Sequence, residues 1–348
     1  MCYSSNGKEI YMKKLIVCIG ILCLSAGIGF TQSATNLDDF KNGISNFAED
    51  LGSVLPMNTV IGLNWNDAYI GDVVNISPHF GIGLTTGFTT LPYKRIRSLV
   101  ENAMGGDSED IPGIIRKTGV PIPAAAIDAR IGGFLLPVDL GIKLGYFSMD
   151  SSDLKIDYLL VGGDVRYCVM DQAILIPKIS VGFGFNYMKT DIKLSNALGD
   201  DITIDIPATY SGLTGISSLD LTSPDLYMEM ETKVFDFKTQ ASWKFLVFEP
   251  SIGLGASYGI SKVYAGAESK LTKNNGKQLS QKEKEALSSL GFDIDDSSIG
   301  YTKNVRAFAY RVFGGMGFNL SIVRLDFGLM YGMNSGSWGA TFGGRIQI

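Results

Sequence analysis

Residues 306–348 read RAFAYRVFGGMGFNLSIVRLDFGLMYGMNSGSWGATFGGRIQI, and bulky apolar residues alternate there with small or polar ones. In the middle run, Val323, Leu325, Phe327, Leu329 and Tyr331 alternate with Arg324, Asp326, Gly328 and Gly332. Side chains of a β-strand point alternately to opposite faces, so each run predicts a strand with one apolar face and one polar, glycine-rich face. The apolar face must contact either a second sheet or lipid.

Composition favours a membrane protein. The chain has 348 residues with 42 glycines, and only 19% of them are charged. About a quarter of the residues in an average soluble domain are charged. The net charge is −5 and no basic patch stands out, so a nucleic-acid partner has no electrostatic support.

The N-terminus has the features of a secretory signal peptide. Lys13 and Lys14 precede an apolar run, Leu15–Phe30, and small residues follow in Thr31-Gln32-Ser33. The run is shorter than the roughly 20 residues of a permanent transmembrane helix, so we expect cleavage. We therefore assign 1–33 as a signal peptide, with Met12 as the natural start. Only Cys168 then remains in the mature chain, which excludes an internal disulfide.

The next segment, 34–57, has helical periodicity. One face carries the apolar residues Phe40, Ile44, Phe47 and Leu51, and the other carries acidic residues and a lysine. Two interpretations stay open, namely a short packed or interfacial helix and a plug that folds into the lumen of a barrel. In the second interpretation the four apolar residues are candidates for contact with a ligand.

Residues 58–348 read as a series of strands. Alternation recurs at 58–65, 68–76, 79–88, 125–135, 138–146, 154–168, 180–187, 228–234 and 251–260, before the three C-terminal runs. Several runs have the 9–11 residues that a tilted strand needs to cross a bilayer. We predict a transmembrane antiparallel up-and-down β-barrel of about 12 strands, with 10–14 possible, closed by pairing of 338–348 with 59–65.

Charged residues in the middle of strands support the barrel over a sandwich. In a membrane barrel the charged face points into a wet interior and the apolar face meets lipid. We expect the lumen to be lined by Asp128, Arg130, Asp139, Lys143, Glu229, Glu231, Lys233, Arg311, Arg324, Asp326 and Arg345.

Three long connections, 92–123, 191–225 and 267–300, separate otherwise tight turns. Bacterial barrels have short periplasmic turns and long outer loops, so an even strand number places all three connections outside the cell. We expect short helices in two of them, at 93–104 and 279–290.

The sequence contains few residues that indicate catalysis or the binding of a metal or cofactor. The chain has one histidine, His79, and one mature cysteine, so we expect no metal site, no cofactor and no enzymatic activity. The glycine spacing at 81–87 suggests a phosphate-binding loop, but it recurs at 253–259 on the inward face of a predicted strand. We attribute it to crowding inside the barrel.

The export signal, the polar–apolar segment 34–57, the glycine-rich strands and the C-terminal run FGGRIQI resemble bacterial outer-membrane barrels. The layout is most similar to treponemal relatives of the FadL/TodX transporters of hydrophobic compounds. This resemblance implies an outer-membrane location, a plugged lumen and uptake of compounds such as long-chain fatty acids. It implies contacts with membrane lipid, and with the outer-membrane assembly machinery through the C-terminal strand.

Two other functions remain open. A general diffusion porin would have an open lumen lined by the charged residues above. A surface adhesin or antigen would act through the three long outer loops.

Overall fold

The fold is taken from a computed structural model that describes residues 37–70, 78–95, 97, 113–133, 136–151, 154–173, 176–195, 202–273, 276–295 and 297–348. The predicted signal peptide and its start at Met12 lie outside these residues. Within the described ranges, no helix is both long and apolar enough to cross a bilayer.

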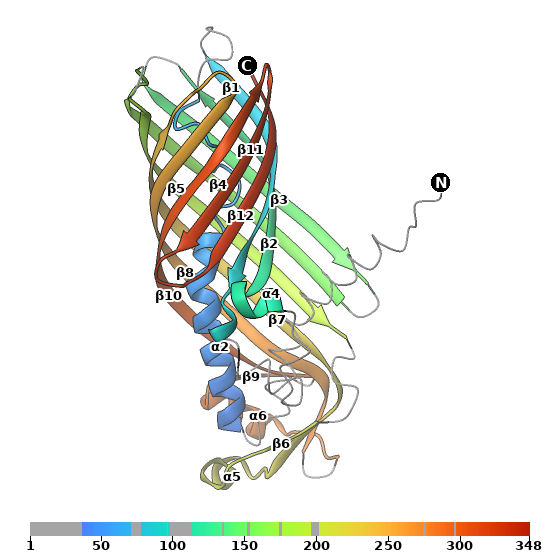
Figure 1. Cartoon of the computed structure of the whole chain (residues 1–348). Coiled ribbons are helices and arrows are strands. Elements are labelled where there is room, and N and C mark those ends of the chain that lie inside the picture. The colour runs from blue at the N-terminus through green and yellow to red at the C-terminus, as the bar shows by residue number, and fades with distance from the viewer. Residues whose placement is uncertain are drawn as a thin grey trace.

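The chain forms one long helix followed by an antiparallel sheet (Figure 1). The helices are α2 (Leu37–Asn58), α4 (Gly113–Thr118), α5 (Ala208–Thr214) and α6 (Gln281–Ser289). The strands are β1 (His79–Leu91), β2 (Val120–Gly132), β3 (Val138–Asp150), β4 (Leu154–Met170), β5 (Lys178–Leu194), β6 (Ile202–Asp205), β7 (Ser218–Ser242), β8 (Phe248–Lys273), β9 (Phe292–Ile294), β10 (Ser298–Leu320), β11 (Val323–Gly332) and β12 (Trp338–Gln347).

Ten of these strands close into a barrel. The order is β1-β2-β3-β4-β5-β7-β8-β10-β11-β12, and β12 pairs with β1 to complete the ring. At that seam Phe80 and Ile348 exchange both backbone hydrogen bonds, at 2.9 and 2.8 Å. β6 pairs only with β7 and β9 only with β10, so both lie outside the ring. The β1–β12 pairing joins the first and last strands of the sheet, as a sheet in lipid requires.

The predicted antiparallel barrel and N-terminal helix are confirmed, whereas the count of twelve strands is not. Residues 59–65 and the described part of 68–76 form no strand, and 71–76 lie outside the described residues. β12 therefore closes against β1 and not against 59–65. The alternation in 59–65 comes from a segment whose apolar and polar residues are both buried inside the barrel.

The two ends of the barrel differ. The β7–β8 and β10–β11 turns and the C-terminus lie at one end, the upper end in Figure 1, which we call the turn end. At the opposite end, the loop end, β7, β8 and β10 extend beyond the ring and carry β6, β9, α5 and α6. Of the two helices expected in long connections, α6 spans 281–289. At 93–104 only 93–95 and 97 are described, and they are helical.

The outer face near the turn end is an apolar belt. On β5, Val181, Phe183, Phe185 and Tyr187 point outward, while Ser180, Gly182, Gly184 and Asn186 point inward. The exposed large apolar residues recur on every strand of the ring, whereas soluble monomers rarely expose contiguous apolar patches larger than a few hundred Å². Lipid is the environment that such a belt fits.

Toward the loop end the two faces exchange character along the same strands. On β5, Lys189, Asp191 and Lys193 continue the outward face, and Met188, Ile192 and Leu194 continue the inward one. β4 and β7 change in the same way, and the paired residues Tyr187 and Lys233 both lie at the boundary. The strands therefore leave the lipid belt here and continue as a water-facing sheet with its own apolar core.

The position of this boundary can be tested with a pair of arginine substitutions. Ile142 is 68% exposed in the middle of the belt on β3, so Ile142→Arg should lower the free energy of unfolding in lipid vesicles by about 2–4 kcal/mol. The control is Glu229→Arg on the outward face of β7, which loses a surface ion pair with Lys189 worth about 1 kcal/mol at most. Equal losses in urea unfolding of the two variants would show that the belt extends beyond the boundary assigned here.

Candidate functional site: the filled lumen

The segment 59–70, which we call the lumen segment, passes through the interior of the barrel toward the turn end. It has no regular secondary structure, and most of its residues are buried. Gly62 and Leu63 both have positive φ angles, +83° and +54°. Such a conformation is unfavourable for leucine and persists only where surrounding contacts hold it, so the wall of the barrel must fix this turn.

Basic and amide side chains of the wall hold the backbone carbonyls of the lumen segment. Lys143 donates to the oxygens of Thr59 and Ile61 at 2.5 and 2.8 Å. Lys238 donates to Leu63 O at 3.1 Å. Three further carbonyls, of Trp65, Asn66 and Asp67, accept from Gln240 or Arg166 at 2.6–3.1 Å. These carbonyls have lost water, so the bonds avoid the cost of leaving them unpaired.

Acidic and hydroxyl groups of the wall accept hydrogen bonds from N–H groups of the same segment. Trp65 Nε1 donates to Asp128 at 2.9 Å, and Ile70 N donates to Asp139 at 2.9 Å. Asn66 N donates to Asp326 at 3.2 Å, and Ala68 N donates to Ser242 Oγ at 3.0 Å. The segment is therefore bound through both donors and acceptors, on strands from all around the ring.

Asp67 is the one acidic residue that the lumen segment adds to the interior. Arg345 Nη2 lies 2.8 Å from its carboxylate and Arg324 Nη1 lies 3.5 Å from it. The guanidinium of Arg345 also lies over the Trp65 ring, 4.1 Å from its centroid. A buried carboxylate between two guanidinium groups fixes the segment electrostatically.

The buried charges of the lumen balance among the described residues. Seven acids and seven bases lie there: Asp67, Asp128, Asp139, Asp164, Asp236, Glu249 and Asp326, with Arg130, Lys143, Arg166, Lys238, Arg311, Arg324 and Arg345. Most of them form ion pairs with one another, either between neighbouring strands, as in Arg166–Asp139 at 2.7 Å, or across an intervening strand, as in Arg311–Asp236 at 2.7 Å. The lumen therefore presents a neutral, internally bonded network.

Eight of the eleven charges predicted for the lumen lie in this network. Glu229, Glu231 and Lys233 do not, because they point outward from β7 and pair with Lys189 or with each other. They lie beyond the boundary at which the two faces of the sheet exchange character. There the charged side chains face water outside the barrel, and Met228, Met230 and Val234 face its interior. The sequence prediction missed Asp236 and Lys238 on the same strand, although their alternation with Phe235 and Phe237 indicates an inward face.

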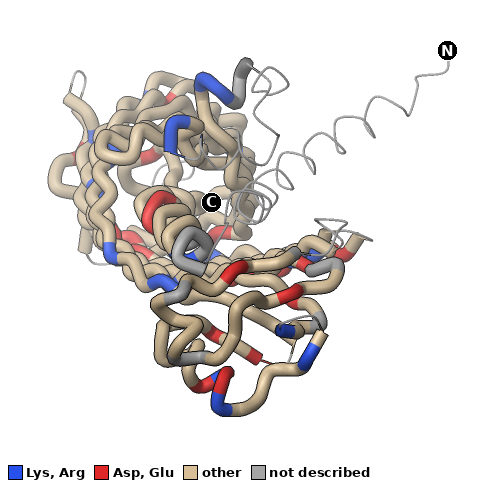
Figure 2. The backbone as a smooth tube through the Cα atoms, turned by 90° about the horizontal axis from the view of Figure 1, so that it is seen from below, with Lys and Arg blue, Asp and Glu red and all other residues tan. Residues whose placement is uncertain are grey.

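The helix α2 fills the loop-end half of the lumen. Seen along the barrel axis from the loop end, it stands within the mouth of the ring (Figure 2). Phe47 and Leu51 are fully buried, as are Val54 and Leu55 on the next turn. The side chains of Phe40 and Ile44, the other two predicted ligand contacts, lie outside the described part of the chain. The helix packs mainly against β10 and β8, where Gly52 faces Val305 and Pro56 faces Gly259.

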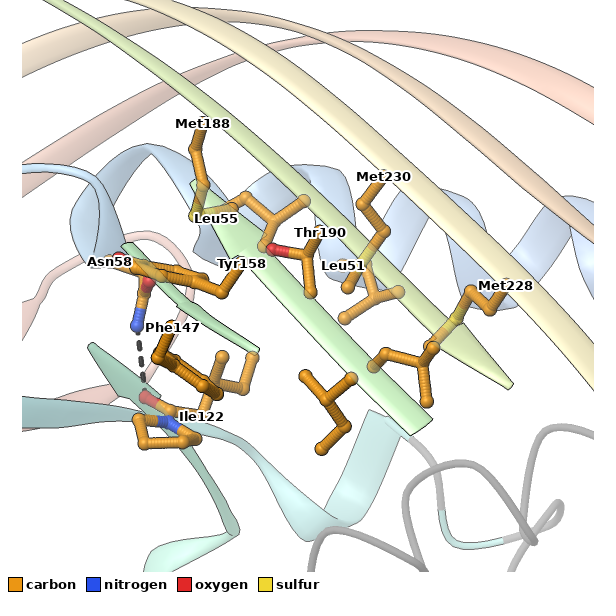
Figure 3. Close-up of a pocket in the computed structure, with 13 residues that line it drawn as sticks. Leu51, Leu55, Asn58, Ile122, Phe147, Tyr158, Met188, Thr190, Met228 and Met230 are labelled. Atoms are coloured by element: carbon orange, nitrogen blue, oxygen red, sulfur yellow. Dashed lines mark hydrogen bonds between the residues drawn. The ribbon is translucent and has the colours of Figure 1, made fainter. Parts of the chain in front are cut away.

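On the opposite side α2 and the wall enclose an apolar cavity of about 60 Å³ (Figure 3). Its lining is almost entirely aliphatic, aromatic or thioether: Leu51, Leu55, Asn58, Ile122, Pro123, Phe147, Ile156, Tyr158, Met188, Thr190, Ile192, Met228 and Met230. The rings of Phe147 and Tyr158 stack with centroids 5.0 Å apart. Asn58 Nδ2 donates to Ile122 O at 2.9 Å, whereas Asn58 Oδ1 and the Tyr158 hydroxyl are buried without a partner.

The wall beside this cavity is split. β2 pairs with β1 along its whole length, but it pairs with β3 only from Ile127 to Gly132. Residues 120–126 of β2 form no pairs with β3, and residues 145–150 of β3 form no pairs with β2. Pro121 and Pro123 fall in the unpaired part, and proline cannot donate a backbone hydrogen bond, so it is confined to sheet edges. Ile122, Pro123 and Phe147 line both the split and the cavity.

The other residues considered for chemistry do not converge. His79 begins β1 at the turn end with Nδ1 buried and unpartnered. Its neighbour Ser77 lies outside the described residues. The described residues contain no group of three or more histidine, cysteine or acidic side chains that could hold a metal ion.

Removing Asp67 should loosen the lumen segment and leave the ring intact. Loss of one partner of a buried ion pair costs about 3–5 kcal/mol, because Arg345 and Arg324 stay buried without their acid. We expect Asp67→Ala to raise single-channel conductance in planar bilayers above that of the unmodified protein. The control Asp171→Ala removes an exposed acid at the turn end and should leave conductance unchanged. Identical recordings for the two variants would contradict an anchoring role of Asp67.

Solved structures with a similar course of the chain are outer-membrane barrels of several kinds. They include the Escherichia coli outer membrane protease OmpT (TM-score 0.36, 11% identity, 79% of this chain and 98% of that chain). They also include the translocator domain of the autotransporter NalP from Neisseria meningitidis (0.35, 8%, 80% and 89%) and the Pseudomonas putida toluene transporter TodX (0.25, 8%, 85% and 96%). At these TM-scores none of them bears on the function of this chain.

Sequence comparison gives a family. No curated protein sequence matches the chain. A family model described as Lsa36-like matches residues 123–347, from within β2 to the end of β12. The match covers most of the barrel and leaves out α2 and the lumen segment. The chain therefore belongs to the Lsa36-like family.

Proposed function

We propose that this protein is an outer-membrane transporter that takes up uncharged hydrophobic compounds. They enter from the loop end, occupy the cavity beside α2 and leave sideways through the split between β2 and β3. The observation that carries this proposal is the coincidence of the cavity with the split, because Ile122, Pro123 and Phe147 belong to both. The split begins directly beyond the last β2–β3 pair, Ile127 and Leu144, whose exposed side chains belong to the lipid belt, so a compound that leaves the cavity emerges at the border of that belt.

The lining of the cavity favours an uncharged ligand. It contains no acidic or basic residue, and its polar groups are an amide and two hydroxyls, on Asn58, Tyr158 and Thr190. An ionised carboxylate placed there would be desolvated without a counter-charge, which costs several kcal/mol. The unpartnered Asn58 Oδ1 and Tyr158 hydroxyl suit one hydrogen-bonding group on an otherwise apolar molecule. Fatty acids, which the family resemblance suggested, would bind in their protonated form.

Passage requires a movement of α2. A cavity of about 60 Å³ is well below the roughly 300–1,000 Å³ of typical small-molecule sites. Leu51 and Leu55 form its helical side, so a small displacement of α2 enlarges it without breaking strand pairing. The methionines on the wall, Met188, Met228 and Met230, are adaptable side chains that can follow such a change.

The alternatives are less well supported. A general diffusion porin needs lumen charges that face water, whereas here they bond to the lumen segment or to one another. The adhesin hypothesis relies on the loop end, where α5, α6, β6 and β9 add structure outside the ring. No particular contact of these elements identifies a partner, so that function remains a prediction from the sequence.

Filling the cavity should abolish uptake. Met188→Trp places a larger side chain between α2 and the wall, and uptake of radiolabelled decan-1-ol by cells that express the variant should fall to the level of cells without the protein. The matched control is Phe183→Trp, on the same strand but facing lipid, which should leave uptake unchanged. Decanoate at neutral pH should be taken up more slowly than decan-1-ol.

Undiminished decanol uptake by Met188→Trp, with the variant folded and in the membrane, would rule out this route. Faster uptake of decanoate than of decanol would leave the route intact and contradict the uncharged ligand.

A further inference from the structure

The direction in which the chain passes through the barrel places the start of α2 at the loop end. Lys41 Nζ donates to Leu290 O at 2.9 Å and lies over the rings of Phe292 and Tyr301, at 5.8 and 5.4 Å from their centroids. Leu290 and Phe292 lie between β8 and β10, and Tyr301 lies near the start of β10, at the loop end. Two to three turns later Glu49 pairs with Lys303 at 3.1 Å, and Asp50 pairs with Arg95 at 2.9 Å.

The other end of the threaded segment lies at the turn end. Ile70 N donates to Asp139, near the start of β3, and Asp67 pairs with Arg345, near the end of β12. β1 then begins at the turn end, where its second residue, Phe80, pairs with Ile348. Residues 37–70 therefore cross the barrel once, from the loop end to the turn end, before the first strand of the wall begins.

Barrels of the outer membrane place their short turns in the periplasm and their long connections outside the cell. We infer that the N-terminal end of α2 is presented on the outer face of the membrane. The barrel thus displays one end of the helix that fills its own lumen at the cell surface. This inference depends on the path of the chain and is independent of the proposed transport.

Three contacts hold the displayed end in place. The Lys41, Glu49 and Asp50 interactions join it to three parts of the loop end, namely Leu290 between β8 and β10, Lys303 on β10, and Arg95 between β1 and β2. Between them, Asn42 and Asn46 are exposed. A protein in the periplasm has no access to this end of the plug, so it cannot pull α2 out of the lumen by its N-terminus.

Cysteine labelling on whole cells tests the inference. In a cysteine-free background that includes Cys168→Ser, Asn42→Cys should react with a membrane-impermeant maleimide on intact cells. Two variants calibrate the experiment: Glu285→Cys on α6 marks the loop end, and Leu246→Cys, 94% exposed between β7 and β8, marks the turn end. We expect Asn42→Cys to label like Glu285→Cys, and Leu246→Cys to label only after the outer membrane is permeabilised.

Labelling of Asn42→Cys only after permeabilisation, like the turn-end variant, would overturn the inference. So would labelling of Leu246→Cys on intact cells while Glu285→Cys stays protected, because the barrel would then have the opposite orientation. Failure of Asn42→Cys to label under either condition would also contradict it, since that side chain is exposed in the structure.

Discussion

Fourteen charged side chains of the described residues are buried inside this barrel, and the need to pair them shapes the rest of the structure. A buried charge without a partner costs several kcal/mol, so a wall with this composition requires either water or a bonded filling. Here the filling is the backbone of 59–70, whose carbonyls accept from Lys143, Lys238 and Arg166. The lumen segment needs no regular secondary structure, because the wall supplies the hydrogen bonds that a helix or strand would otherwise supply.

A second constraint is the exchange of polar and apolar faces along the strands. Near the turn end the barrel is apolar outside and charged inside, as lipid demands. Beyond Tyr187 on β5 and Lys233 on β7 it is charged outside and apolar inside, as water demands. The apolar interior of this second part is what packs against α2 and leaves the cavity. The candidate site therefore exists only because the strands continue beyond the membrane.

Much of the wall could be predicted from the sequence. Alternation of period two identified all ten strands of the ring, and eight of the eleven predicted lumen charges lie inside it. The errors have physical causes. Residues 59–65 alternate like a strand although they are buried on all sides, because apolar and polar residues in them meet different parts of the wall. On β7 the polar residues point inward within the lipid belt and outward beyond it. The alternation of polar and apolar residues alone therefore cannot indicate which face of a strand meets lipid.

The cavity and the split could not be predicted. Their lining comes from α2 and five strands of the wall, and only three-dimensional pairing shows that 120–126 lacks a partner in β3. Pro121 and Pro123 were a signal for an interrupted strand edge, but their place beside the cavity depends on the path of α2.

The seam between β1 and β12 also constrains how this molecule is assembled. It joins β1 to β12, the first and last strands of the ring, so the ring cannot close until all the strands between them are present. Such late, long-range closure is slow compared with local pairing. While the sheet is still open, the seven acids and seven bases of the interior can form their bonds with the lumen segment. The same contacts that fill the mature barrel therefore also guide its assembly.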